Sequence, residues 1–472
     1  MKKNFLKAVA LGAVAAISVT MFAGCGGTGT SEAPRDEQGR VIISVGGWPD
    51  KEGPSLDNIN ARKAGFEAAN TDVVVEPDLW KFDRKTFYAK AAGGQLPTVF
   101  NVGYTEMPEI INSEYSADLT DVLSKRGYDG MFNENIMNTI ADEDGRIFAF
   151  PTSSYILGLN VHIDLFKEAG LLAEDGTPRQ PKDWNELAEM AKIIKEKTGK
   201  AGFVFPTANK VGGWIFTCLA WSFGVDFMEK GEDGKWQAKF DSPECVEALQ
   251  FIKDLKWEHD VLPANTLIDY NEMYKVFSTG GAGMLIAAGD SPNYVYSFGM
   301  KPDQLGMVAL PAGPKRHVTL LGGGTNCVKA GATEEEIDAS IRWIETSYNY
   351  QLTEEYKANT IKSIDQQLAE GRLVGIKSMS PWSSNAESLN WHYQLIDEKA
   401  NSNPNHVKLY NDFVLNCPAE VQPEEPVCCQ ELYETLDGCL QEVLTNKDAD
   451  CAALLKGAAA DFQANYLDNL TY

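Results

Sequence analysis

Hydrophobic residues recur along the chain in short continuous runs that alternate with helical spacings. Residues 41–45, Val-Ile-Ile-Ser-Val, are typical of a strand that is buried on both faces. Helical spacing follows over residues 55–69, an apolar run over 73–75, and helical spacing again over 84–92. The run at 94–100, Gly-Gln-Leu-Pro-Thr-Val-Phe, leads into a third strand. Strands that alternate with helices predict a doubly wound parallel sheet, which binds ligands at the carboxyl ends of its strands.

The segment at residues 146–170 predicts a change of lobe. Two β-rich runs, residues 147–150 and 155–159, are separated by Pro-Thr-Ser-Ser, and the helical pattern that follows stops at Gly170. We interpret this segment as a strand that leaves one lobe and enters a second. Residues 306–314 are interpreted as the second crossover, which returns to the first lobe.

Later helices are predicted from their start signals. Asp183 and Glu186 are spaced as in a capping box, as are Thr333 and Glu336, and Ser242 precedes a proline in a first helical turn. Helical spacing also covers residues 431–445 and 450–470 at the end of the chain, and these two helices are expected to complete the second lobe.

Length and charge narrow the class of protein. A chain of 472 residues suits two lobes, each large enough to bury its own core. Lys and Arg number 42 against 67 Asp and Glu, which gives a net charge of −25. Such a surface repels nucleic acid, so no nucleic-acid partner is expected.

The first 24 residues are predicted to be a signal peptide. They combine basic residues near the start with an apolar run over 8–22 that is too short and alanine-rich to predict a membrane span. The run ends in Phe-Ala-Gly-Cys25, and residues 25–40 are small, polar and charged, which predicts a flexible tether.

Several motifs resemble those of a known family. The run Gly-Arg-Ile-Phe-Ala-Phe-Pro at 145–151, Asn160, the Phe-Lys-Glu-Ala-Gly-Leu helix at 166–171 and the helix start at Trp184 resemble the extracellular solute-binding proteins of family 1. Those proteins are receptor subunits of ABC importers, mostly for sugars. The residues that end at Cys25 also resemble the bacterial lipoprotein box, although the box usually has leucine where Phe22 stands. The resemblance implies that Cys25 is lipidated with acyl chains such as palmitate.

The family resemblance implies an α/β, two-lobed, periplasmic-binding-protein-like fold of type II. Each lobe is expected to be a sheet flanked by helices, with a hinge of two or three crossover segments and a ligand cleft between the lobes. Lobe 1 is expected to comprise residues 41–152 and 311–350, and lobe 2 residues 153–310 and 351–472.

Aromatic residues stand beside acidic residues after each of the first three predicted strands. A sugar offers an apolar CH face and a ring of hydroxyls, so a sugar receptor needs aromatic rings together with carboxylates and amides. Separate structural roles for these residues are the alternative interpretation. The candidate ligand-binding pairs are Trp48 with Asp50, Trp80 with Asp83, and Tyr104 with Glu106.

The family resemblance supplies further candidate ligand contacts, mainly in the second lobe. Asp290 is the preferred acceptor for a sugar hydroxyl, and Trp391 competes equally with Trp382 for the place of a late aromatic contact. The glycines at 322–324 indicate close backbone approach at a strand end. The further candidates are Trp214, Asp290, Asn293, Gly323 and Trp382.

Catalytic signatures are missing from the sequence. It contains no GxSxG, GxxxxGK[ST] or HExxH motif, and the five histidines are scattered. No catalytic residue, metal site or cofactor is therefore predicted. Eight cysteines follow Cys25, and they are either partly joined by disulfides among residues 417–451 or kept as thiols in a reducing habitat.

The sequence thus predicts a monomeric lipoprotein, anchored on the outer face of the cytoplasmic membrane, that captures a carbohydrate. An oligosaccharide is the favoured ligand, and the expected partner is the pair of transmembrane subunits of an ABC permease. Two alternatives stay open: a cell-surface glycoside hydrolase or lyase, because 67 acidic residues could include a catalytic pair, and a binding lipoprotein for a non-sugar ligand.

Overall fold

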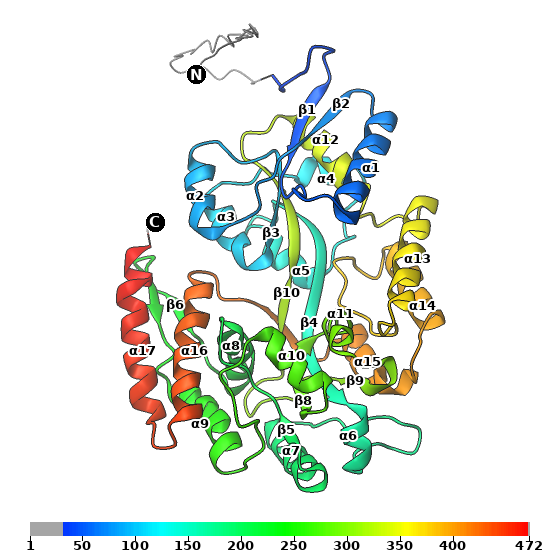
Figure 1. Cartoon of the computed structure of the whole chain (residues 1–472). Coiled ribbons are helices and arrows are strands. Elements are labelled where there is room, and N and C mark those ends of the chain that lie inside the picture. The colour runs from blue at the N-terminus through cyan, green and yellow to red at the C-terminus, as the bar shows by residue number, and fades with distance from the viewer. Residues whose placement is uncertain (1–31, 471–472) are drawn as a thin grey trace, which may run out of the picture. The chain divides into compact units, whose positions relative to one another are not determined.

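A computed structural model describes residues 32–470, and the residues from Ala33 onward form one compact unit. The predicted signal peptide and Cys25 lie outside the described residues. Strands from both halves of the chain join one nine-stranded sheet (Figure 1). Its strands are β1 (Val41–Val45), β2 (Val73–Pro77), β3 (Val99–Gly103), β4 (Phe150–His162), β5 (Ala201–Phe203), β8 (Ala282–Ala288), β9 (Leu305–Val308), β10 (Val318–Val328) and β11 (Glu420–Pro423), while β6 (Met228–Lys230) and β7 (Trp236–Ala238) form a separate hairpin.

The sheet is mixed, whereas the sequence predicted a parallel one. Its order is β2-β1-β3-β10-β4-β8-β5, with β11 beside β10 and β9 beside β4. β1 is parallel to β2 and β3, whereas β10 is antiparallel to both β3 and β4. Figure 1 shows the two long strands β4 and β10 side by side along the molecule. They run in opposite directions because the chain leaves one half of the sheet along β4 and returns along β10.

β4 is one continuous strand of 13 residues, where two shorter β-rich runs were predicted. The intervening Pro-Thr-Ser-Ser stays in the sheet because its polar groups find partners. Ser153 and Ser154 pair with Gly324 and Gly323 of β10, and the Ser154 hydroxyl donates to the carbonyl of Met379 at 2.9 Å. The predicted interruption between the two runs was thus overridden by tertiary hydrogen bonds.

The return crossover lies later in the chain than predicted. Residues 305–308 form β9, which pairs with β4 between Leu159 and His162 and so remains in the second half of the sheet. The crossing strand is β10, which pairs with β4 at Leu321 and with β3 at Val328.

Helices flank the sheet on both sides (Figure 1), and several of their predicted start signals are confirmed. Asp183 and Ser242 each accept a hydrogen bond from the backbone three residues later, and Thr333 forms a reciprocal capping box. The helices are α1 (Pro54–Ala69), α2 (Arg84–Ala92), α3 (Met107–Asn112), α4 (Thr120–Lys125), α5 (Glu134–Ile140), α6 (Ile163–Glu168), α7 (Trp184–Thr198), α8 (Val211–Phe223), α9 (Pro243–Trp257), α10 (Tyr270–Ser278), α11 (Pro292–Val295), α12 (Glu334–Glu345), α13 (Glu354–Ala369), α14 (Glu387–Glu398), α15 (Lys408–Asn416), α16 (Cys429–Thr445) and α17 (Cys451–Asn465).

The second half of the predicted tether is packed on the folded body. Ala33 is buried, the backbone N–H of Ile42 donates to the carbonyl of Pro34, and Arg35 forms an ion pair with Glu335 at 2.6 Å. A flexible tether up to residue 40 is therefore not what the structure has, because these polar residues find partners near β1 and α12.

The described residues bear on two expectations from the sequence, a membrane span and the state of the cysteines. Among residues 32–470, no helix is long and apolar enough to cross a membrane. The eight cysteines of this part are free thiols in the structure, and Cys218 and Cys245 are buried as expected. Burial raises the pKa of Cys218 to about 12. Of the two alternatives that the sequence left open, disulfides among residues 417–451 are therefore not formed in this structure.

Close contact between α8 and α16 depends on Gly213. A Cβ atom at this position would lie 2.2 Å from the carbonyl oxygen of Tyr433, which is a backbone atom and cannot swing away. Gly213→Ala is therefore expected to force the two helices apart and to lower the free energy of unfolding by about 1–3 kcal/mol. The melting temperature of the variant measures this effect.

The matched control is Gly438→Ala on α16. A Cβ atom there would meet nothing within 4 Å, so the change adds only helix propensity. It should stabilise the protein by roughly 0.5–1 kcal/mol. Equal melting temperatures for the two variants would contradict the close packing of α8 on α16.

Candidate functional site

Tyr155 lies where β4 and β10 join the two halves of the sheet. In the strand ladder it is opposite Gly322. A Cβ atom at Gly322 would lie 2.1 Å from Cζ of Tyr155, so the phenol ring lies across the bare glycine backbone. The half-buried ring therefore occupies the junction that any ligand held between the two halves would approach.

Two carboxylates face Tyr155 from different parts of the chain. Burial raises the pKa of the Tyr155 phenol, and the negative charges of Glu424 and Asp290 raise it further. Glu424 directly follows β11, and Asp290 follows β8. The phenol therefore lies within the field of both acids.

Glu424 forms hydrogen bonds with residues from two distant parts of the chain. Its Oε1 accepts a hydrogen bond from the Tyr433 hydroxyl on α16 at 2.6 Å, and its Oε2 accepts from the Thr105 hydroxyl just after β3. Burial raises the pKa of Glu424, while its bonds with Thr105 and Tyr433 lower it. Both oxygens thus have uncharged donors.

Tyr104 and Glu106 lie in the short 3₁₀ turn η1 (Tyr104–Glu106), directly after β3. Tyr104 is 2% exposed, its hydroxyl has no hydrogen-bond partner among the described residues, and its ring lies against Gly323. Gly323 has a φ of +150°, and a Cβ atom there would lie 2.6 Å from Tyr104 Cε2. Only glycine suits this close approach.

Arg84 is the cation beside this turn. Its guanidinium bonds Glu106 at 2.5 Å and Glu109 at 3.2 Å, and it approaches Glu431 of α16 at 3.9 Å. Burial raises the pKa of Glu106, and Arg84 opposes that shift. One arginine is therefore shared by three carboxylates.

Asp290 stands beside a group of tyrosine rings. The ring centroids of Tyr270, Tyr274 and Tyr294 lie 4.9 to 5.1 Å from one another. Burial raises the pKa of Asp290. Its Oδ1 atom is enclosed and has no hydrogen-bond partner among the described residues. A ligand donor at this oxygen would gain a strong bond.

Trp214 is placed by the capped end of α8. The carboxylate of Asp437 accepts from the backbone N–H groups of Lys210 and Gly213 at 2.6 and 2.7 Å. This cap fixes the first turn of α8 against Tyr433 of α16, and half-buried Trp214 is the next residue. Trp214 therefore stands near the helix that holds Glu424 in place.

The structure brings about half of the predicted ligand residues into one neighbourhood, and the rest lie elsewhere. Trp48 is 2% exposed and stacks on Trp343 at 6.1 Å, inside the core. Trp382 is 7% exposed and stacks on Phe132 at 5.5 Å. Neither ring is open to a ligand in this structure, because aromatic partners cover them. The residues that come together are Tyr104, Glu106, Trp214, Asp290 and Gly323.

Other predicted residues have local partners. Asp83 caps α2 by accepting from the backbone of Thr86, and the exposed Asn293 accepts a hydrogen bond from Arg372 at 2.9 Å. Of the remaining predicted ligand residues, Asp50 is exposed and Trp80 stacks on Phe87. Trp391, the alternative to Trp382, packs on Tyr356.

Sequence reasoning missed Tyr155, Thr105, Glu424 and Tyr433. Tyr155 was assigned to a strand, and nothing in one sequence shows that it faces a glycine of a distant strand. Thr105 was passed over between two chosen neighbours. Glu424 and Tyr433 lie more than 300 residues from Thr105 along the chain, so only the fold shows that they meet.

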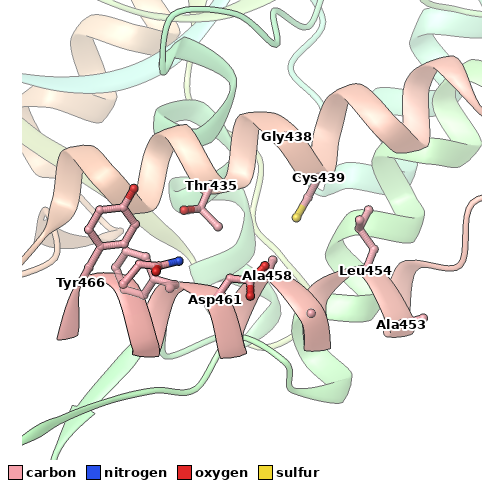
Figure 2. A pocket seen from close by; sticks show the side chains of 11 residues that line it. Thr435, Gly438, Cys439, Ala453, Leu454, Ala458, Asp461 and Tyr466 are labelled. Carbon is pink, nitrogen blue, oxygen red and sulfur yellow. The ribbon is translucent and has the colours of Figure 1, made fainter. Parts of the chain in front are cut away.

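The site offers hydrogen-bond acceptors and ring faces, which suits recognition of a polar ligand with apolar faces. No group of histidine, cysteine, aspartate or glutamate that could hold a metal ion occurs in the described part of the chain. A separate groove of about 470 Å³ lies between α16 and α17, with Cys439 directed into it (Figure 2). None of the site residues lines that groove.

Comparison with known proteins identifies the family. The model of the bacterial extracellular solute-binding proteins matches residues 50–347. The chain belongs to this family. As a solute-binding protein of an extracellular family it is an exported protein, as predicted.

Individual relatives of this solute-binding protein are distant. A probable ABC transporter-binding protein of Deinococcus radiodurans is 29% identical over 241 residues, which are 45% of this chain. The match spans about half (53%) of that relative's length. The diacetylchitobiose binding protein DasA of Streptomyces coelicolor is 23% identical over 71% of this chain and 76% of its own. The solved structure of maltose-bound MalE3 of T. maritima is 23% identical, has a TM-score of 0.61, and covers 90% of this chain and 99% of its own. The two-lobed type II fold is thereby confirmed.

Proposed function

We propose that this solute-binding protein captures a carbohydrate between its two lobes and delivers it to an ABC permease. One observation carries the proposal: Tyr155 lies across Gly322 at the junction of the two halves, within the electrostatic influence of two carboxylates, Glu424 and Asp290. A ring face with several acceptors matches the CH face and hydroxyls of a sugar. The relatives whose names mention diacetylchitobiose and maltose support a saccharide ligand.

Binding would act by shifting the population of a closed state. The proposed lobe 1 comprises residues 41–152 and 311–350, and lobe 2 comprises residues 153–310 and 351–472. A hydrogen bond from the Thr105 hydroxyl to Glu424 connects these two segments. A ligand that contacts both lobes only when they are closed stabilises that state by its differential affinity, and the permease then distinguishes the closed form.

The remaining parts of the proposal concern export and anchoring. Residues 1–24 would be removed as a signal peptide, and lipidated Cys25 would hold a monomer on the outer face of the cytoplasmic membrane, near its permease. More than one acyl chain gives stable anchoring, whereas one chain is marginal.

A thermal-shift screen tests the ligand class. We expect one family of mono- or oligosaccharides to raise the melting temperature saturably, because a ligand of the folded state stabilises it in proportion to the logarithm of its concentration. Amino acids and polyol phosphates serve as controls. A shift only with a non-sugar would contradict the carbohydrate assignment and favour the alternative ligand class.

The same samples test for catalysis. We propose stoichiometric binding without turnover, so the saccharide should be recovered intact after prolonged incubation. Released product would favour the glycoside hydrolase alternative. In that case Glu424 and Asp290 would be the acids to replace, since both have raised pKa values beside one phenol.

A further inference from the structure

Asp290 is a half-buried carboxylate that forms no ion pair with any side chain that the structure describes. Burial raises its pKa, hydrogen bonds from its own backbone and from the Tyr294 hydroxyl lower it, and no lysine, arginine or histidine is among the groups that alter it. Arg372 approaches the same turn but bonds Asn293 and Glu370 instead. The Oδ1 atom of Asp290 is enclosed and unbonded. An ionised carboxylate in this position lacks a countercharge.

Tyrosine rings make up the surroundings of this carboxylate. The charge of Asp290 raises the pKa of each of five phenols, in every case after burial, so all five lie within its field. Their ring faces carry partial negative charge and attract a cation. The five are Tyr155, Tyr270, Tyr274, Tyr294 and Tyr410.

The rest of the site adds further negative charge. Glu424 is held only by the hydroxyls of Thr105 and Tyr433, which bring no positive charge. Arg84 is already shared by Glu106, Glu109 and Glu431. The described acids in this part of the molecule therefore outnumber the bases. A ligand without positive charge leaves this excess of negative charge in place, whereas a cationic ligand neutralises part of it.

Three ligand charges can be compared. An anionic sugar would be repelled by these acids, and a neutral hydroxyl would give Asp290 one hydrogen bond but no countercharge. An ammonium group would give both the bond and the countercharge, and it would also lie near the faces of the tyrosine rings. In a partly buried site at low dielectric the charge interaction is the largest of these effects.

We propose that the site selects a saccharide with a free ammonium group, an amino sugar, whose ammonium binds Asp290 while its ring lies against Tyr155. The inference rests on the proposed saccharide function, because it names the class of sugar that this same site takes. It does not follow from the relatives, since diacetylchitobiose and maltose are both uncharged.

The test uses sugars that differ at a single position. Glucosamine, N-acetylglucosamine and glucose, each as the monomer and as the β-1,4-linked trimer, present an ammonium, an amide or a hydroxyl at C2. Calorimetric titration of the exported chain at 0.05 M salt is expected to show at least tenfold tighter binding of a glucosamine ligand than of its glucose counterpart. In 0.5 M salt this preference should fall, because the interaction is between charges.

Asp290→Asn tests the assigned residue. The amide keeps the size of the side chain and one acceptor oxygen but carries no charge, so the ratio of the dissociation constants of the ammonium and hydroxyl ligands should lose its tenfold preference. Asp365→Asn is the matched control, since Asp365 is exposed on α13 and pairs with Lys399. It should leave the preference unchanged.

The possible failures can be told apart. Equal or tighter binding of the glucose series would overturn the inference and leave the carbohydrate function standing. If a wider panel finds only a non-sugar ligand, both the inference and the proposed function are overturned. A preference that survives 0.5 M salt and the Asp290→Asn change would overturn the assignment of the ammonium to this carboxylate.

Discussion

Tyr155→Ala is expected to weaken saccharide binding by about 100-fold, which corresponds to roughly 2.7 kcal/mol of binding free energy. The ring is the aromatic surface at the junction of β4 and β10, and its phenol faces both Glu424 and Asp290. Removing it takes away a large contact area and leaves both acids facing water. Calorimetric titration with the saccharide found by the thermal-shift screen measures the loss.

Gly322→Ala tests the position of the same ring without removing it. Its new Cβ would fall 2.1 Å from Tyr155 Cζ, so the phenol must move away from β10. Binding should weaken in the same direction as for Tyr155→Ala. The matched control is Tyr356→Ala, which removes a phenol that packs on Trp391. If Tyr155→Ala binds as well as this control, the site is not at the junction.

Glu425→Gln is expected to change how stability depends on pH. Glu425 is 7% exposed, and its Oε1 accepts a hydrogen bond from Nε1 of Trp221 at 2.9 Å. Burial raises its pKa from 4.5 to about 7, the Trp221 bond and Arg316 lower it, and Asp226 raises it. The folded protein therefore retains a proton that the unfolded chain loses.

The direction of the effect follows from this difference. The unfolded carboxyl ionises near pH 4.5, whereas the folded one ionises near pH 7. The contribution of protonated Glu425 to the free energy of unfolding is greatest below pH 4.5. It falls as the pH rises from 4.5 to about 7 and changes no further above pH 7. The loss amounts to roughly 3 kcal/mol, since each pKa unit corresponds to about 1.36 kcal/mol.

The measurement compares wild type with Glu425→Gln at pH 5 and at pH 8. The amide keeps an acceptor for Trp221 but cannot ionise. The free energy of unfolding of the variant minus that of wild type should therefore be roughly 2–3 kcal/mol larger at pH 8 than at pH 5. All other titrating groups cancel in this comparison. Glu398→Gln, an exposed position on α14, should show no such change. A constant difference between wild type and Glu425→Gln at both pH values would contradict the burial of an ionisable carboxyl here.

Local signals predicted much of the secondary structure correctly. β1 and α2 have the predicted bounds, and the caps at Asp183, Ser242 and Thr333 form as expected. These features depend on neighbours within a few residues, so one sequence contains the information that forms them. The family resemblance added the two-lobed fold, because it was carried by motifs spread over most of the chain.

The candidate site was predicted only in part. Residues directly after strands could be found by position, and Glu106 and Asp290 both lie in the neighbourhood of Glu424 and Tyr155. Trp48 and Trp382 were equally plausible by composition, yet each is covered by an aromatic partner from a distant segment. Whether an aromatic ring is buried or open depends on which segment packs over it, and that partner cannot be read from a local pattern.

The sequence by itself therefore determined the alternating strands and helices and the capped ends of those helices, since each rests on short-range spacing, and its resemblance to a known family supplied the class of protein. Only the tertiary structure decided that β4 and β10 cross in opposite directions, that Tyr155 lies over Gly322, and that Glu424 reaches Thr105. These contacts join residues that are hundreds of positions apart. They depend on strand register and on the packing of whole elements, and neither is specified by any short stretch of the chain.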